Sequence, residues 1–180
     1  QLHAKVGTPP TVNNALYKPA QGTESGNPTI IIGDGDGTIL RNLPLDSDVV
    51  QHEAGHHVIF RHLTSTEGDS LVLHEGLADF FVFAFSGDAC LGESICPDDT
   101  NACWPPGGPN TCLRSADNNY AIDDPAFSPS YPPHLVGQVI SGLLWDLYAY
   151  YSHELDDIAV LTFKAIPFLR EESTFHDFFV

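Results

Sequence analysis

Apolar residues recur at helical spacing in the first of four stretches of the chain, the second is a continuous apolar run, and with the residues at their ends the four stretches predict four helices. They cover residues 46–63, 70–85, 134–151 and 154–169. Residues that suit helix ends stand beside them: an Asp-Ser pair begins the first helix, a glycine follows the second, and two prolines precede the third. Beyond residue 45 the chain is therefore expected to be mainly helical, with one long interruption.

The remaining segments are rich in turn-forming residues. Residues 1–28 repeat Pro, Gly and Asn, which predicts loops with short extended pieces. The apolar run at 28–32 predicts a buried strand, and the glycines of 33–37 force a turn after it. Residues 88–132 form a loop rich in Pro, Gly and Asp. The pattern predicts an α+β fold, with a small N-terminal region of strands and loops and a mainly helical remainder.

The chain has 180 residues, which is enough for one full-sized hydrophobic core, and we expect a single domain. Its expected parts are a strand and loop region at 1–45, two helices at 46–88, a loop at 89–132 and a helical part at 133–180. The end of the sequence, 175–180, is too apolar for a solvated tail, so we expect the folded domain to continue past it.

The charge and the apolar runs of the chain exclude two classes of binding partner. Acidic residues outnumber basic ones 24 to 7, and the net charge of −17 repels the phosphate backbone of nucleic acids. Hydrophobic residues make up 42% of the chain, but no apolar run approaches the roughly 20 residues of a membrane span. We therefore expect a globular protein whose partners are neither nucleic acids nor membranes. Most of its carboxylates are expected to form a solvated surface.

Four cysteines lie in the long loop, at Cys90, Cys96, Cys103 and Cys112. Because this loop has little apolar surface of its own, two disulfides would stabilise it, in any of three connectivities. Disulfides indicate an oxidising compartment, so the protein is expected to be secreted or extracellular, with the periplasm as an alternative. A zinc site made of four thiolates is the competing interpretation, although the paired Cys-x-x-Cys spacing is missing.

The first predicted helix contains a His-Glu-x-x-His sequence at His52, Glu53 and His56. The i, i+4 spacing places both imidazoles on one helix face, where they can bind one metal ion. Such an ion lowers the pKa of a bound water, and the carboxylate of Glu53 can accept the proton as that water attacks a carbonyl group. The plain alternative is a helix that carries histidines without a metal. Two further histidines, His57 and His62, are expected to be ordinary surface residues.

Catalytic zinc usually takes three protein ligands and keeps one position for water, so a third ligand must come from elsewhere. The second predicted helix offers Glu75 and Asp79, again at i and i+4. One can bind the metal, and the other can accept a hydrogen bond from a metal-bound imidazole and fix its tautomer. We assign Glu75 to the first role and Asp79 to the second.

The order of these motifs resembles the thermolysin-like metallopeptidases, whose third zinc ligand is a glutamate on the next helix, with some similarity to fungalysin-type peptidases. Residues 14–17, Asn-Ala-Leu-Tyr, are similar to the family's substrate-binding edge strand, and 32–37 followed by 48–53 closely track the approach to its zinc helix. The resemblance implies a zincin-like fold with the active-site cleft around the first helix. It also implies that Asn14 and Ala15 bind the substrate backbone.

Two more side chains acquire roles through the resemblance. Arg114 matches an arginine that binds a substrate carbonyl, and His134, which opens the third helix, matches a histidine that donates a hydrogen bond to the tetrahedral intermediate. The family's specificity pocket matches four apolar residues, which are Leu40, Leu43, Val49 and Leu113. This match predicts a preference for a bulky hydrophobic residue after the scissile bond.

The sequence departs from the family pattern in several places. The tyrosine that assists the histidine has no counterpart, and Tyr131 is the candidate substitute. His74 stands where the family usually has an asparagine, so we expect it to hydrogen-bond a ligand or to contact the metal. The part after His134 is short for the family's helical lobe. Asp48 matches a calcium ligand and Asp88 lies loosely near it in sequence, which makes calcium an additional expected cofactor beside zinc.

The expected function is that of a monomeric zinc endopeptidase acting on peptides or proteins. A zinc aminopeptidase is the nearest alternative, because eighteen residues separate His56 from Glu75, a spacing that also resembles that family. Against it, no Gly-Ala-Met-Glu-Asn-like segment for an amino terminus is present, and the chain has no methionine. A non-catalytic binding module, in which zinc and disulfides only stabilise a surface, is the alternative from another class.

Overall fold

The structure is a computed structural model that describes most of the chain: residues 2–7, 13–98, 100–103, 111–121, 131–151, 155–170, 173–174 and 177–178. Most of the apolar end at 175–180 and the predicted helix start at residue 154 lie outside the described residues. The chain folds into two compact units. Unit 1 comprises Gln1–His57 and Cys90–Ser115, and unit 2 comprises Val58–Ala89 and Ala116–Val180. The single domain expected from the sequence stays a prediction.

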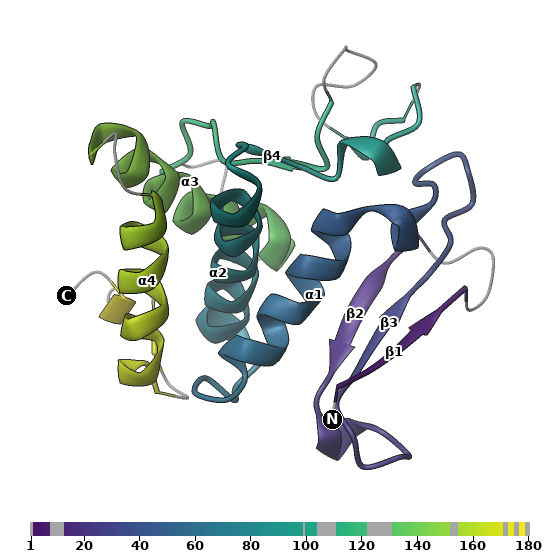
Figure 1. The fold of residues 1–180 in the computed structure, drawn as a ribbon, viewed down its shortest axis with the longest axis horizontal. Helices are drawn as coiled ribbons and strands as arrows, with labels where there is room; N and C mark the ends of the chain where they lie inside the picture. Colours follow the sequence, from purple (N-terminus) through teal and green to yellow (C-terminus); the bar gives the residue numbers. More distant parts are fainter. Residues whose placement is uncertain are drawn as a thin grey trace. The chain divides into compact units, whose positions relative to one another are not determined.

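Unit 1 is built on a small three-stranded sheet (Figure 1). Its strands are β1 (His3–Val6), β2 (Ala15–Lys18) and β3 (Thr29–Ile32), in the order β1-β3-β2. β1 runs parallel to β3, and β2 runs antiparallel to it. The central strand was predicted as the buried apolar run, and this prediction is confirmed because Thr29, Ile30 and Ile32 are buried.

The turn after β3 is held by a carboxylate. Asp36 accepts hydrogen bonds from the side chain of Asn13 and from the backbone N–H groups of Thr38 and Ile39. These bonds stabilise the charged form, and they hold the pKa of Asp36 below its ordinary value, with Asn13 the largest cause. Gly35 faces the backbone of Leu40 so closely that any side chain would collide with it. Glycine is therefore required at position 35, because no other residue would fit there.

The helix α1 (Ser47–Ile59) follows this turn and the 3-10 helix η2 (Leu43–Leu45). It was predicted to reach residue 63, but it ends four residues earlier. The N–H groups of His62 and Leu63 both bond to the carbonyl oxygen of Ile59, in a turn that closes the helix. Leu63 is nevertheless fully buried. The apolar pattern of the sequence therefore extends beyond the last residue of the helix.

A second small element of unit 1 is the pair β4 (Cys90–Leu91) and β5 (Arg114–Ser115), which are antiparallel. The 3-10 helices η1 (Ala20–Gly22) and η3 (Glu93–Ile95) complete the unit. Two disulfides join Cys90 to Cys112 and Cys96 to Cys103, so the prediction of two disulfides is confirmed and the four-thiolate zinc site is wrong. The core of the unit gathers residues from the sheet, α1 and this loop, which include Ile30, Ile32, Leu40, Leu43, Val49 and Ile95.

Unit 2 is helical, as its sequence period predicted. Its helices are α2 (Gly68–Ser86), α3 (Pro133–Tyr151) and α4 (Leu155–Ala165), the last followed by the 3-10 helix η4 (Ile166–Phe168). α2 ends at Gly87, which has φ 70° and bonds its N–H to the carbonyl oxygen of Phe83. The prediction that the fourth helix reaches residue 169 is wrong, because Pro167 has no N–H to continue the α-helical ladder.

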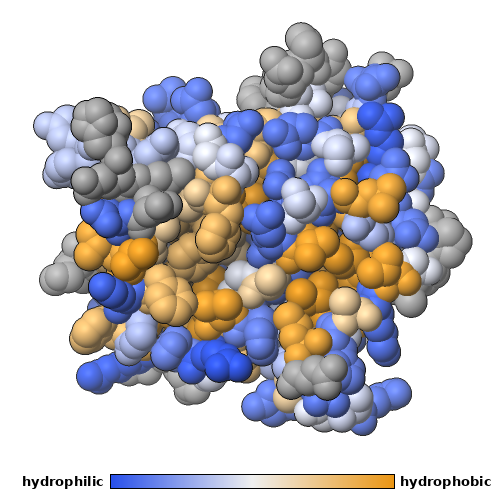
Figure 2. All heavy atoms as spheres, viewed as in Figure 1, coloured by the Kyte–Doolittle hydropathy of each residue, from blue (hydrophilic) through white to orange (hydrophobic). Residues whose placement is uncertain are grey.

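The core of unit 2 lies where α2, α3 and α4 meet. Its buried side chains include Leu73, Leu77 and Phe80 from α2, Ile140 and Leu144 from α3, and Ile166 from η4. α4 is apolar on more than one side: Ile158 and Ala159 pack against this core, whereas Leu161 and Phe163 are exposed. Figure 2 shows apolar side chains at the surface over the place that α4 takes in Figure 1. Among the described residues, no helix is both long and apolar enough to cross a membrane.

Two glycines let α2 and α3 approach with backbone against backbone. A Cβ at Gly76 would lie 2.6 Å from the carbonyl oxygen of Gly137, and a Cβ at Gly137 would lie 2.8 Å from the nitrogen of Gly76. Both distances are far below van der Waals contact, and the atoms concerned belong to rigid helical backbone. The sequence therefore fixes how closely these helices pack.

Gly76→Ala is expected to lower the free energy of unfolding by about 2–3 kcal/mol, because the added methyl group must push the two helices apart. Gly22→Ala is the matched control, since nothing lies within 4 Å of a Cβ at that position. Urea unfolding followed by circular dichroism measures both variants. Equal midpoints for the two would contradict the close approach.

Candidate metal centre

The two motif histidines lie side by side on α1. The Nε2 atoms of His52 and His56 are 3.0 Å apart, and the rings are nearly perpendicular, with an interplanar angle of 84°. Both residues are buried. One helical turn separates them, which places their ring nitrogens at the same point on one helix face. The pair thus offers two nitrogen ligands to a single ion.

The start of α1 is fixed by Asp46. One oxygen of its carboxylate accepts hydrogen bonds from the N–H groups of Asp48 and Val49, at 2.9 and 3.4 Å, as a helix N-cap does. The other oxygen accepts a hydrogen bond from the hydroxyl of Ser94 at 2.5 Å. Because Ser94 belongs to the disulfide-bonded loop, this one buried carboxylate joins the loop to the helix that carries the histidines.

Asp48 makes a second connection to the same loop. Its carboxylate accepts a hydrogen bond from the N–H of Gly92 at 3.1 Å and lies 3.5 Å from the hydroxyl of Ser47. These contacts give Asp48 a place in the packing of unit 1. The calcium site expected at Asp48 stays a prediction, and Asp88, the other expected ligand, is exposed.

Arg114 reaches the histidine pair from β5. Its Nη2 atom lies 3.4 Å from Nδ1 of His52, and its neighbour Leu113 bonds its N–H to the carbonyl oxygen of Leu91. A guanidinium can only donate, so Nδ1 is the acceptor in this contact. The loop that the disulfides and the two aspartates hold in place therefore presents a cation beside His52.

Unit 2 contributes the candidate third ligand from α2. Glu75 and Asp79 are both buried, and Oε2 of Glu75 lies 3.2 Å from Nε2 of His134 at the start of α3. The side chain of His134 is 49% exposed, whereas that of Glu75 is 7% exposed. The close approach of Gly76 and Gly137, each within three residues of this pair, brings the two side chains together.

His74 forms a hydrogen bond to the backbone of its own unit. Its side chain is buried, and Nε2 donates a hydrogen bond to the carbonyl oxygen of Leu63 at 2.7 Å. This bond connects α2 to the turn that follows residue 59 and uses one ring nitrogen. A contact with a ligand or metal, which the sequence suggested, stays a prediction that involves only Nδ1.

His52, His56 and Glu75 form one group: each offers a ligand atom, and these atoms all lie within 4.8 Å of one another. Zinc bonds nitrogen at 2.0–2.1 Å in tetrahedral geometry, so two ligating nitrogens are expected about 3.3 Å apart. The observed 3.0 Å between the imidazoles is close to that value. Two imidazoles and a carboxylate are also a ligand set that zinc prefers. The residues present therefore fit a zinc ion.

The residues that the sequence assigned to substrate binding differ in their burial. Asn14 is exposed, Ala15 is half-buried on β2, and Tyr131 is exposed just before α3. The four residues matched to a specificity pocket share one cluster: Leu40, Leu43 and Val49 are buried in the core of unit 1, and Leu113 is half-buried against it.

The prediction that His57 is an ordinary surface residue is wrong. It is half-buried, and its Nδ1 atom lies 3.0 Å from the hydroxyl of Tyr17 on β2. The residue lies one position from a candidate ligand, but on a different face of α1, and it joins the helix to the sheet. Only the pairing of β2 against α1 reveals this contact, and no local signal in the sequence indicates it.

Comparison with known proteins supports the fold. No protein-family model matches the sequence, and no curated protein matches it. Among solved structures, the precursor of protealysin, a metalloproteinase from Serratia proteamaculans, is similar with a TM-score of 0.65 and 15% sequence identity. The match covers 83% of this chain and 54% of that structure, so the chain spans about half its length. The predicted α+β fold is confirmed, and it is similar to the fold of that metalloproteinase precursor.

Asp46→Ala is expected to lower the free energy of unfolding by about 1–2 kcal/mol, because it removes the N-cap of α1 and leaves the hydroxyl of Ser94 without this acceptor. Asp46→Asn keeps an oxygen that can cap the helix and should lose less. Asp69→Ala, at an exposed position in the first turn of α2, is the control. A guanidinium titration of the three variants gives the comparison, and an Asp46→Ala midpoint equal to that of Asp69→Ala would refute the cap.

Proposed function

We propose that this chain is a zinc-dependent peptidase in which His52, His56 and Glu75 bind the metal. The observation that carries the proposal is the group formed by these three buried side chains, whose ligand atoms lie within 4.8 Å of one another. The similarity of the fold to that of a metalloproteinase precursor supports it. So does the position of Glu53, which is buried and stands next to the first histidine.

Three protein ligands leave one position of a tetrahedral zinc ion for water. When bound, zinc lowers the pKa of that water and polarises the carbonyl group of a substrate. Glu53 accepts the proton of the attacking water and passes it to the amine that leaves. Its carboxylate is buried beside the first histidine, which keeps it away from bulk water.

His134 and Arg114 act on the substrate. Nε2 of His134 donates a hydrogen bond to the carbonyl oxygen as negative charge develops on it, and the half-exposed ring can reach a bound peptide. The guanidinium of Arg114, which can only donate hydrogen bonds and lies beside His52, is assigned to bind a substrate carbonyl group.

β2 is the proposed surface for the substrate backbone. Within the described part of the chain it pairs with β3 along one edge, so its other edge can pair with an extended peptide. Residues 14–16 would hold the peptide antiparallel to this strand, with Asn14 and Ala15 supplying backbone and side-chain groups. Such strand addition orients the scissile bond without selecting a particular side chain.

The setting follows from the same proposal. Two disulfides favour an oxidising environment, so we place the peptidase outside the cytosol, acting on peptides or proteins as a monomer. Asp79, fully buried on α2, is assigned to orient a zinc-bound imidazole. Calcium bound at Asp48 and Asp88 is part of the proposal as an additional structural ion.

Glu53→Gln is expected to keep one zinc per chain and to lose at least about a hundredfold in kcat, because the base is gone while the ligands remain. His56→Ala should lose the zinc itself, whereas His62→Ala, at an exposed position, should lose neither zinc nor activity. Zinc content by atomic emission and hydrolysis of casein measure the two properties. Full activity of Glu53→Gln would remove this carboxylate from the proposed reaction.

Substrate preference is tested on N-terminally blocked peptides, which an aminopeptidase cannot cleave. We expect cleavage before Leu or Phe to exceed cleavage before Asp or Gly by about tenfold or more in kcat/KM, because burying a large apolar side chain contributes about 1.5–3 kcal/mol. Leu113→Ala should reduce this ratio, and it is the variant of choice because Leu113 is only half-buried. Equal rates on all four peptides would refute the pocket, and no cleavage of blocked peptides would favour the aminopeptidase.

A further inference from the structure

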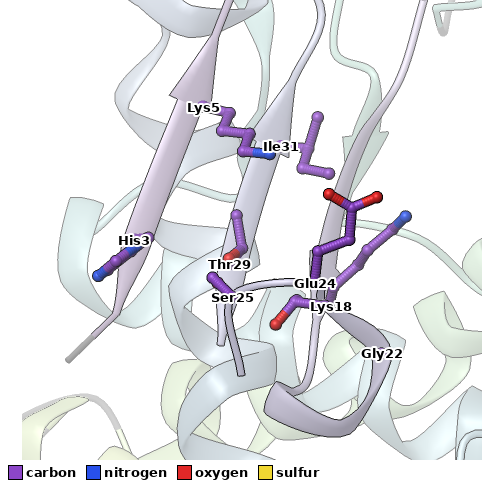
Figure 3. A pocket seen from close by; sticks show the side chains of 9 residues that line it. His3, Lys5, Lys18, Gly22, Glu24, Ser25, Thr29 and Ile31 are labelled. Carbon is purple, nitrogen blue, oxygen red and sulfur yellow. The ribbon is translucent and has the colours of Figure 1, made fainter. Parts of the chain in front are cut away.

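We infer that unit 1 carries a second binding site, a basic pocket on the outer face of its sheet that takes a small ligand with two carboxylate or phosphate groups. The pocket is a cavity of about 400 Å³. Side chains of β1 and β3, the end of β2 and the loop after β2 line it (Figure 3). All of them belong to unit 1, and none has a role in the proposed peptidase reaction. The inference does not depend on that reaction.

The register of the sheet brings the basic side chains together. Thr29 on the central strand pairs with His3 of β1 on one side and with Lys18 of β2 on the other, and Ile31 pairs with Lys5 of β1. Residues that pair directly, or that stand two apart on a strand, share one face of a sheet. These five side chains therefore lie on the face opposite to the buried residues Ile30 and Ile32.

The charge of the pocket is opposite to that of the chain. The sequence has three lysines in a chain of net charge −17, and two of them, Lys5 and Lys18, line this cavity. In the described part of the chain neither lysine forms an ion pair. Figure 3 shows the ammonium end of Lys5 extending across β3, and the carboxylate of Glu24, the one acidic lining residue, on the same side of the sheet. Two ammonium groups outweigh one carboxylate, so the pocket attracts anions.

The loop after β2 that lines the pocket is held by its own hydrogen bonds. Thr23 donates its hydroxyl proton toward the carbonyl oxygens of Ala20 and Asn27, at 3.1 and 2.7 Å, and Thr29 donates to Asn27 as well, at 3.1 Å. Backbone bonds from Gly22 and Thr23 close the same loop. A loop fixed by its own hydrogen bonds loses little freedom when a ligand binds, which favours affinity.

Size and charge together define the ligand. Small-molecule sites occupy about 300–1,000 Å³, and this cavity lies near the lower end of that range. Lys5 and Lys18 extend from the two outer strands, which are separated by the central strand and hence by about 10 Å of sheet. A ligand with two anionic groups can contact both ammonium groups at once, whereas a monocarboxylate contacts one.

The test is isothermal titration calorimetry of the whole chain with succinate and with inorganic pyrophosphate, at low ionic strength. K5Q/K18Q is expected to weaken binding of the preferred anion at least about tenfold, the sum of two charge-assisted contacts. K164Q is the matched control, because Lys164 is the remaining lysine and lies on α4 of unit 2. It should bind as the unaltered chain does.

Glu24 supplies a test of opposite sign. E24Q should tighten binding about threefold or more by removing a repulsive charge, whereas E67Q, at an exposed position in unit 2, should leave the affinity unchanged. If the unaltered chain binds succinate more tightly than pyrophosphate, the pocket is assigned to carboxylates; the reverse order assigns it to phosphoryl groups. If the double variant fails to fold, K5Q and K18Q singly carry the test. Absence of binding, or equal affinities of K5Q/K18Q and K164Q, would overturn the inference.

Discussion

The single turn of α1 between His52 and His56 is the constraint on which the candidate centre depends. It brings two Nε2 atoms to 3.0 Å, and among the described residues this pair belongs to the one group of His, Cys, Asp and Glu side chains that could hold a metal ion. The helix start is fixed in turn, because Asp46 caps it and also accepts the hydroxyl of Ser94, while Asp48 accepts the N–H of Gly92. These two buried carboxylates give the disulfide loop its position on α1, and the loop brings Arg114 to His52.

Unit 2 positions its candidate ligand by a different arrangement. Gly76 and Gly137 allow two helices to touch through their backbones, and the neighbouring side chains of Glu75 and His134 then meet at 3.2 Å. A glycine in a helix interior costs about 1 kcal/mol relative to alanine, so the close approach is obtained at the expense of helix stability. Both units thus place their polar groups by backbone contacts: hydrogen bonds to N–H groups in unit 1 and direct packing in unit 2.

Much of this could be predicted from local patterns, and the failures have physical causes. The pattern of apolar residues and of residues at helix ends predicted four helices and the strand at 28–32, and helical spacing predicted the pairing of His52 with His56. The predicted helix ends were less accurate. The apolar residue Leu63 was assigned to the first helix, whereas it is buried in the turn that follows that helix. Contacts between distant segments, such as Tyr17 with His57, have no local signature, since they depend on which strand packs against which helix.

The candidate metal centre and the proposed basic pocket differ in the sign of their charge, so the first is suited to a cation and the second to an anion. Glu53, Glu75 and Asp79 are carboxylates buried in a chain of net charge −17, and burial of a carboxylate costs free energy unless positive charge compensates for it. The distant field of the chain makes that cost larger, so compensation must be local, and Glu75 has the imidazole of His134 as a polar neighbour at 3.2 Å. A divalent cation among the candidate ligands would supply more of it. On the sheet the situation is reversed, because Lys5 and Lys18 are exposed and hydrated, so their charges cost little in the free chain and are available to an anion.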